Sequence, residues 1–204
     1  AGLLSTKLTE THLFGEVKLS NEELKSGLNW NSDAVSRTTL LSAWAMKEAI
    51  AQAGVKIDSE VGLVSSTSVG GMDRSEDFFE PYYTKEDFGN VSMLATHDCG
   101  ICTTQAAAHF GITGYATTIS TACSSAANAI ALGARLLRQG KLKRVIVGGT
   151  DALCRFTANG FNSLMILDTE WCKPFSENRA GLNLGEAAAY LVLESREDAE
   201  SRGA

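Results

Sequence analysis

The sequence lacks any hydrophobic run long enough to cross a membrane, although hydrophobic residues make up 44% of its 204 residues. A membrane-spanning helix needs about 20 consecutive apolar residues. We therefore expect no membrane segment, and enough apolar side chains to build a core. The chain also lacks internal repeats, low-complexity segments and linkers. Its length then predicts a single domain over residues 1–204, with no second domain.

Positive charge is in the minority, because 18 Lys and Arg residues face 24 Asp and Glu residues, a net charge of −6. This balance argues against nucleic acid as a partner, whereas an acidic protein partner would need only a local basic patch. Lys141, Lys143 and Arg144 form one basic cluster, which is more typical of a solvated turn. No signal-peptide pattern opens the chain, and its five cysteines are odd in number. We therefore expect free thiols in a reducing cytoplasm.

Hydrophobic periodicity and stop signals predict an alternation of helices and short buried strands, which is typical of an α/β fold. The predicted helices are 36–53, 103–110, 124–139 and 156–167, and the predicted strands are 61–65 and 145–149, with a turn at Gly70-Gly71. Residues 1–32 are polar and poorly periodic, and we expect them to be loop or poorly structured. Residues 73–90 are charged and aromatic, and we expect an excursion over the surface.

Cys123 lies where the β-rich run 117–120 turns into a helix of small residues. A thiol at that point faces backbone N–H groups that have no intrahelical partner, and also the positive end of the helix dipole. Both favour the thiolate, which is the nucleophilic form. The helix is thin and carries no charge from Cys123 to Gly133, so we expect it to be closely packed on several sides. Cys123 is therefore a candidate for covalent catalysis, although many free cysteines are buried and inert.

Two other groups of residues suggest different chemistry. His97, Cys99, Cys102 and His109 offer four nitrogen and sulfur ligands within thirteen residues, so a zinc site is one hypothesis, and a Cys99–Cys102 redox pair is another. We predict neither metal nor cofactor, because a helix that begins just after Cys102 would carry His109 two turns away. Cys123 paired with a histidine, as in a hydrolase, is a further alternative.

Ser120-Thr121-Ala122-Cys123-Ser124-Ser125-Ala126 resembles the nucleophile motif of the β-ketoacyl–acyl carrier protein synthases. These are the condensing enzymes of fatty acid and polyketide synthesis. The resemblance continues in order along the chain, through Phe110-Gly111-Ile112-Thr113-Gly114, Val147 to Ala152, Cys172-Lys173-Pro174-Phe175, Arg179, Gly181 and Gly185-Glu186-Ala187. It covers nearly everything after about Asp33.

The resemblance implies a thiolase-like fold, in which two similar halves stack as α/β/α/β/α layers, usually in a dimer. This chain resembles most of the first half, so residues 1–204 would form an N-terminal half-domain. The second half of the family supplies two catalytic histidines and a supporting lysine. None of His12, His97 and His109 matches either histidine. We therefore expect either a fragment of a full synthase, which we favour, or a chain that a partner completes.

The activity that the resemblance implies is acyl transfer to Cys123, followed by condensation with malonyl–acyl carrier protein. The implied partners are an acyl carrier protein and a second subunit, in a homodimer or heterodimer. Phe161 matches a pocket residue of the family, while Met72 and Phe78 follow the double glycine in a segment that lines its acyl pocket. The alternatives are a coenzyme A–dependent enzyme of the same fold and a non-catalytic acyl-binding or scaffolding partner. The presence of Cys123 argues against the chain-length-factor subfamily, whose members lack it.

Overall fold

The computed structural model describes residues 4–85 and 89–204. The helices are α1 (Asn21–Leu28), α2 (Arg37–Ala53), α3 (Met72–Lys85), α4 (Cys99–Phe110), α5 (Ser125–Arg138), α6 (Arg155–Ser163) and α7 (Arg196–Ser201), with 3-10 helices η1 (Lys7–Glu10) and η2 (Val91–Thr96). The strands are β1 (Phe14–Gly15), β2 (Val61–Ser66), β3 (Ala116–Ile119), β4 (Arg144–Asp151), β5 (Leu184–Gly185) and β6 (Ala187–Glu194). None of the helices in these described ranges is long and apolar enough to cross a bilayer.

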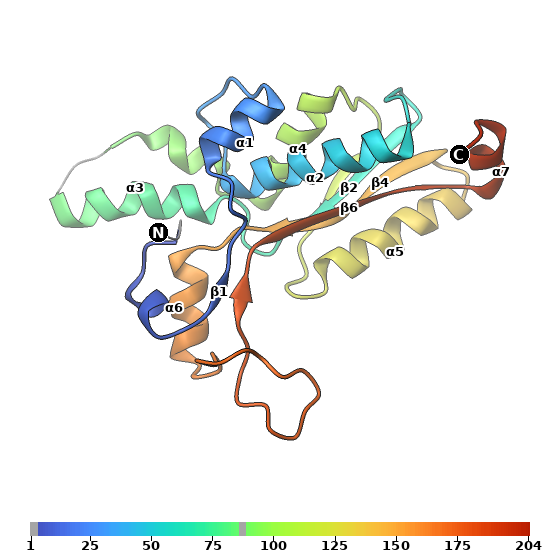
Figure 1. Cartoon of the computed structure of the whole chain (residues 1–204). Helices are drawn as coiled ribbons and strands as arrows, with labels where there is room; N and C mark the ends of the chain where they lie inside the picture. The colour runs from blue at the N-terminus through green and yellow to red at the C-terminus, as the bar shows by residue number, and fades with distance from the viewer. Residues whose placement is uncertain (1–3, 86–88) are drawn as a thin grey trace.

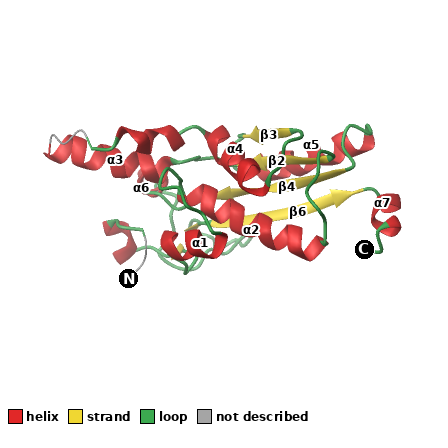
Figure 2. Cartoon of the chain, turned by 90° about the horizontal axis from the view of Figure 1, so that it is seen from above, coloured by secondary structure: helices red, strands yellow, loops and turns green. Residues whose placement is uncertain are grey.

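Four strands form the central sheet in the order β3-β2-β4-β6. The first three run parallel to one another, and β6 pairs with β4 in the antiparallel sense. Helices α2 and α4 lie on one face of the sheet and α5 on the other, as Figures 1 and 2 show. Because β2, β3 and β4 are parallel, their carboxyl ends meet at one edge of the sheet. In open α/β sheets this is the edge where functional loops gather.

The strands β2 and β4 are largely buried on both faces, which explains their apolar runs at 61–64 and 145–149. Alternate residues point to opposite sides, so Leu63 and Ile146 join the core beneath α2 and α4, while Val64 and Val147 join the core beneath α5. Met46 of α2 completes the first of these cores. The sheet therefore holds two hydrophobic layers together and fixes the positions of the loops that leave its edge.

Helix α5 packs closely on the sheet through its small residues, but on one face only. A Cβ atom on Gly133 would lie 2.3 Å from Cγ1 of Val147, so only glycine permits this approach. The residues of α5 that are buried are Ser125, Ala129, Gly133 and Leu136. The expectation that this helix is packed on several sides is wrong for the described chain, because Ala126, Ala127, Ile130 and Ala131 are exposed.

The expectation that residues 1–32 are loop is also wrong in part, while residues 1–3 lie outside the described residues. Helix α1 forms there, because Ser20 and Glu23 make a capping box and because Leu24 and Leu28 are buried against α2. The predicted helix 36–53 is confirmed as α2, with Ser36 as its N-cap.

The segment 73–90, expected to be an excursion over the surface, is chiefly the helix α3 in its described part, and residues 86–88 lie outside the described residues. Helix α3 extends away from the sheet in Figure 1 and contacts η2 and α6. Helix α4 begins at Cys99, four residues earlier than predicted, because Asp98 caps it. Helix α6 ends at Ser163 rather than at 167, and Met165 follows with φ = +57°.

Candidate functional site at the carboxyl edge of the sheet

Cys123 is an exposed free thiol in the turn between β3 and α5. The preceding strand ends at Ile119 and the helix begins at Ser125, so the cysteine occupies the position that the sequence predicts. The turn lies at the carboxyl edge of the three parallel strands. Within the described residues, no side chain caps the N-terminus of α5. The N-cap residue Ser124 therefore offers the first-turn amides no side-chain acceptor, although the N–H of Ser125 donates to the Ala122 carbonyl at 3.0 Å.

The turn that presents Cys123 is strained and held by hydrogen bonds. Ala122 has φ = +51°, a left-handed conformation that non-glycine residues rarely adopt. The Ser125 hydroxyl accepts a bond from the N–H of Thr121 at 2.8 Å and donates to the Ala122 carbonyl at 2.7 Å. The Ser124 hydroxyl donates to the Thr121 carbonyl at 2.8 Å. The serines after the cysteine thus fold back on the turn and fix its shape.

The proposed acyl-pocket residues lie on two helices that contact each other. Met72 begins α3 and is half-buried, Phe78 lies in the same helix and is buried, and Phe161 is half-buried in α6. Helices α3 and α6 are in contact. Within the described residues, no hydrogen bond, ring contact or cavity links the three side chains to Cys123, so the structure brings their helices together without placing them in one pocket with the cysteine.

The rival zinc constellation does not assemble among the described residues, and Cys99 and Cys102 are free thiols in the first turn of α4. His97 is hydrogen-bonded through Nδ1 to the Ser75 hydroxyl at 2.8 Å, whereas His109 stacks on Trp30. Cys102 is buried, and burial raises the pKa of its thiol. Across the described ranges, no three His, Cys, Asp or Glu side chains gather as a metal site would require. His12, the remaining histidine, lies beside the Thr11 hydroxyl.

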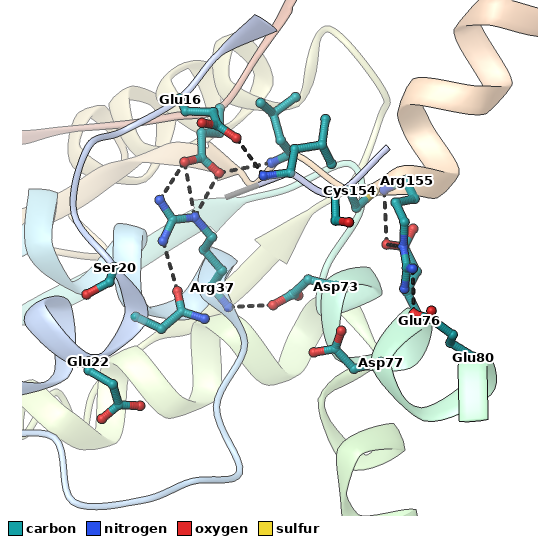
Figure 3. A pocket seen from close by; sticks show the side chains of 15 residues that line it. Glu16, Ser20, Glu22, Arg37, Asp73, Glu76, Asp77, Glu80, Cys154 and Arg155 are labelled. Carbon is teal, nitrogen blue, oxygen red and sulfur yellow. Dashed lines mark hydrogen bonds and ion pairs between the residues drawn. The ribbon is translucent and has the colours of Figure 1, made fainter. Parts of the chain in front are cut away.

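A cavity of about 370 Å³ lies away from Cys123 between the N-terminal segment, α3 and the start of α6. Figure 3 shows that charged side chains line it and that several of them are paired. Arg37 and Glu186 form a buried ion pair at 2.6 Å, and Glu76 pairs with Arg155. The carboxylate of Asp73 accepts a hydrogen bond from the backbone N–H of Arg37, and burial raises the pKa of Asp73. These pairs hold segments together, and we assign the cavity no catalytic role.

Sequence reasoning missed two residues that contact the cysteine turn or its neighbouring loop. Asp151 ends β4, and its Oδ1 accepts hydrogen bonds from the loop that follows β2. Ser68 of that loop donates to the Ala122 carbonyl. A carboxylate at the carboxyl end of a buried strand is a signal that could have identified Asp151, whereas an exposed serine in a loop carries no such signal.

Comparison with known proteins decides the family. A sequence profile described as "Beta-ketoacyl synthase, N-terminal domain" matches residues 16–199, which include Cys123. The chain belongs to this family. It is 30% identical to nodulation protein E of Rhizobium meliloti over 95% of this chain and 51% of that protein. It is 29% identical to 3-oxoacyl-[acyl-carrier-protein] synthase 2 of Staphylococcus aureus over 98% of this chain and 52% of that protein.

The solved structures give the same family. The ishigamide ketosynthase/chain length factor superposes with a TM-score of 0.81 at 26% identity, over 85% of this chain and 45% of the other. The chain therefore spans about half the length of the curated relatives it matches. The predictions of a β-ketoacyl synthase N-terminal half and of one half of a thiolase-like fold are confirmed.

Proposed function

We propose that this chain is the N-terminal half of a β-ketoacyl–acyl carrier protein synthase and that Cys123 accepts the acyl group. The observation that carries the proposal is the position of Cys123. It is an exposed thiol on a strained strand-to-helix turn, before an uncapped helix N-terminus, inside the region matched by the family profile. Backbone N–H groups at such a turn can stabilise a developing oxyanion.

The transfer step follows from this placement. The thiolate of Cys123 attacks the carbonyl carbon of an acyl thioester and forms a tetrahedral intermediate. The bond from that carbon to the sulfur of the carrier protein then breaks. The carrier thiolate leaves and takes up a proton, and the acyl group remains on Cys123 as a new thioester. The family resemblance implies that the second half supports the next step, in which malonyl–carrier protein loses carbon dioxide and its enolate attacks the acyl-cysteine.

The proposed partners are an acyl carrier protein as the acyl donor and a second subunit, in a homodimer or heterodimer. The name of the Staphylococcus aureus relative specifies an acyl carrier protein, and one similar structure is of a ketosynthase/chain length factor. Met72, Phe78 and Phe161 remain our candidates for shaping the acyl pocket. All five cysteines are free thiols, which suits the reducing cytoplasm that we propose as the location.

The test is the intact mass of the complete protein after incubation with an acyl–carrier protein thioester. We expect an acyl adduct on the wild-type protein and none on Cys123→Ala. Cys172→Ala is the matched control, because Cys172 is also an exposed free cysteine, and it should keep the adduct. A protein of roughly twice 21.7 kDa would support the half-domain assignment. No adduct on the wild-type protein would contradict acyl transfer and favour a scaffolding role.

A further inference from the structure

The carbonyl of Ala122 accepts an unusual number of hydrogen bonds for a single backbone oxygen. The hydroxyl and the N–H of Ser125 donate to it at 2.7 and 3.0 Å, and the hydroxyl of Ser68 donates at 3.2 Å. Ser125 belongs to the same turn, whereas Ser68 comes from the loop after β2. Ala122 is the strained residue directly before Cys123. The hydrogen bond from Ser68, which lies outside the turn, can therefore set the orientation of the turn.

The position of Ser68 is in turn set by one carboxylate oxygen. Oδ1 of Asp151 accepts the N–H of Ser68 at 2.7 Å, the hydroxyl of Thr67 at 2.7 Å and the N–H of Val69 at 3.2 Å. The Thr67 hydroxyl also accepts the N–H of Gly70 at 3.1 Å. Hydrogen bonds to an ionised carboxylate are stronger than those between neutral groups. Asp151 therefore organises the whole loop over residues 67–70.

Asp151 itself stands on a rigid base. It is the last residue of β4, which pairs with β2 on one side and with β6 on the other. A chain of contacts therefore runs from the centre of the sheet through the loop to the turn of Cys123. We infer that Asp151 is a positioning residue for the nucleophile, acting through Ser68 on the Ala122 carbonyl. The inference rests on the proposed function, because it assigns Asp151 a role only if Cys123 is acylated.

The test measures acylation of the complete protein in a single turnover, with acyl–carrier protein as the donor. Asp151→Ala and Ser68→Ala should each slow acylation. For Asp151→Ala we expect the acylation rate to fall by roughly 10- to 100-fold, because a displacement of the thiol by about 1 Å is enough for a loss of that size. The double variant should be no slower than Asp151→Ala, because both residues act along one path. Asp151→Asn keeps an acceptor oxygen and should recover part of the rate.

Two further measurements and one control variant separate positioning from a purely structural role. In Asp151→Ala and Ser68→Ala, the rate at which iodoacetamide alkylates Cys123 should stay near the wild-type value, because a small reagent needs no aligned acyl group. The melting temperature reports folding directly. Glu197→Ala, on exposed α7 at the opposite end of β4 and β6, is the surface control and should change none of these measurements.

The inference is overturned if Asp151→Ala acylates at the wild-type rate, if the effects of Asp151→Ala and Ser68→Ala are additive, or if Asp151→Asn is as slow as Asp151→Ala. It is also overturned if acylation falls only in parallel with the melting temperature. An unacylated wild-type protein would be a different failure, because it contradicts the proposed function itself.

Discussion

Ala122 holds a left-handed backbone conformation directly before the exposed thiol. For a residue with a Cβ atom, this conformation costs about 1–2 kcal/mol relative to the right-handed one. Strain of this kind persists where the surrounding hydrogen bonds over-determine the conformation, and it gathers at functional sites. Alanine has the smallest side chain that carries a Cβ atom. The turn therefore keeps a defined backbone conformation at a modest cost in conformational free energy.

Two substitutions at position 122 test this account. Ala122→Gly removes the Cβ penalty but makes the unfolded chain more flexible, so the free energy of unfolding should stay within about 1 kcal/mol of the wild-type value. Ala122→Val places a β-branched side chain in the same conformation and should lose about 1–2 kcal/mol more than the glycine variant. Urea denaturation of the complete protein measures both. Equal stability of the two variants would show that the turn relaxes to another conformation.

At the scale of elements, α3 supplies the N-terminal capping group of α6, and this contact joins the two helices. The N-cap residue of α6, Cys154, makes no side-chain capping bond. Glu76 of α3 takes that place, because its carboxylate accepts the N–H groups of Arg155 and Phe156. The side chain of Arg155 also pairs with Glu76. The two helices that carry the proposed pocket residues are therefore held in a fixed relation.

Glu76→Ala should loosen the first turn of α6 and lower the free energy of unfolding by about 1–2 kcal/mol, as the loss of a helix cap does. Glu76→Gln keeps one acceptor oxygen and should lose less. Hydrogen exchange of the amides at 155–158 measures the effect locally. If the alanine variant loses stability while these amides stay as protected as in the wild type, the cap is not the cause.

Sequence patterns predicted the elements whose signals are local. Strands β2 and β4 contain the apolar runs 61–64 and 145–149, the residue after α2 is a glycine, and the β3–α5 turn that carries Cys123 was visible from its composition. Helix α1 was missed although Ser20 and Glu23 have the spacing of a capping box, because the polar composition of the segment outweighed this helix signal. Helix α3 was missed because its charges and Pro81 disguise the helical pattern.

Contacts between distant segments were beyond the reach of these patterns. The bond from Ser68 to the turn joins residues 54 positions apart, and Asp151 lies 83 positions from Ser68. No periodicity or local motif encodes such pairings, since they arise only when parallel strands bring their carboxyl ends together. The uncovered face of α5 could not be foreseen for the same reason, because burial depends on which elements pack nearby.

At the scale of the whole molecule, the uncharged outer face of α5 is the feature that most needs a partner. Ala127, Ile130 and Ala131 are exposed on this helix. The chain spans about half the length of its curated relatives. A second half packed on α5 would complete the stacked layers of the fold and bury this face.

Ile130→Glu tests whether the outer face is covered in the complete protein. Ile130 is 38% exposed in the chain described. If the second half covers it, a buried unpaired charge should lower the free energy of unfolding by about 2 kcal/mol or more. Gln139→Glu, at the exposed end of the same helix, should cost less than about 1 kcal/mol. Similar small losses in both variants, measured by urea denaturation, would mean that the outer face stays in water.

Because Gly133 is the point of close contact between α5 and the sheet, a tilt of the helix about this point would move the two ends of the helix. The helix begins at Ser125, eight residues before Gly133, and at 1.5 Å per residue its first residue lies roughly 12 Å from this contact. A tilt of the helix by about 5° about this contact would move the helix start, and the turn of Cys123 that precedes it, sideways by roughly 1 Å, which is the scale on which misplacement of a reacting group slows chemistry. The absence of a side chain at Gly133 thus affects the position of a thiol that lies beyond the helix start, more than two helical turns away.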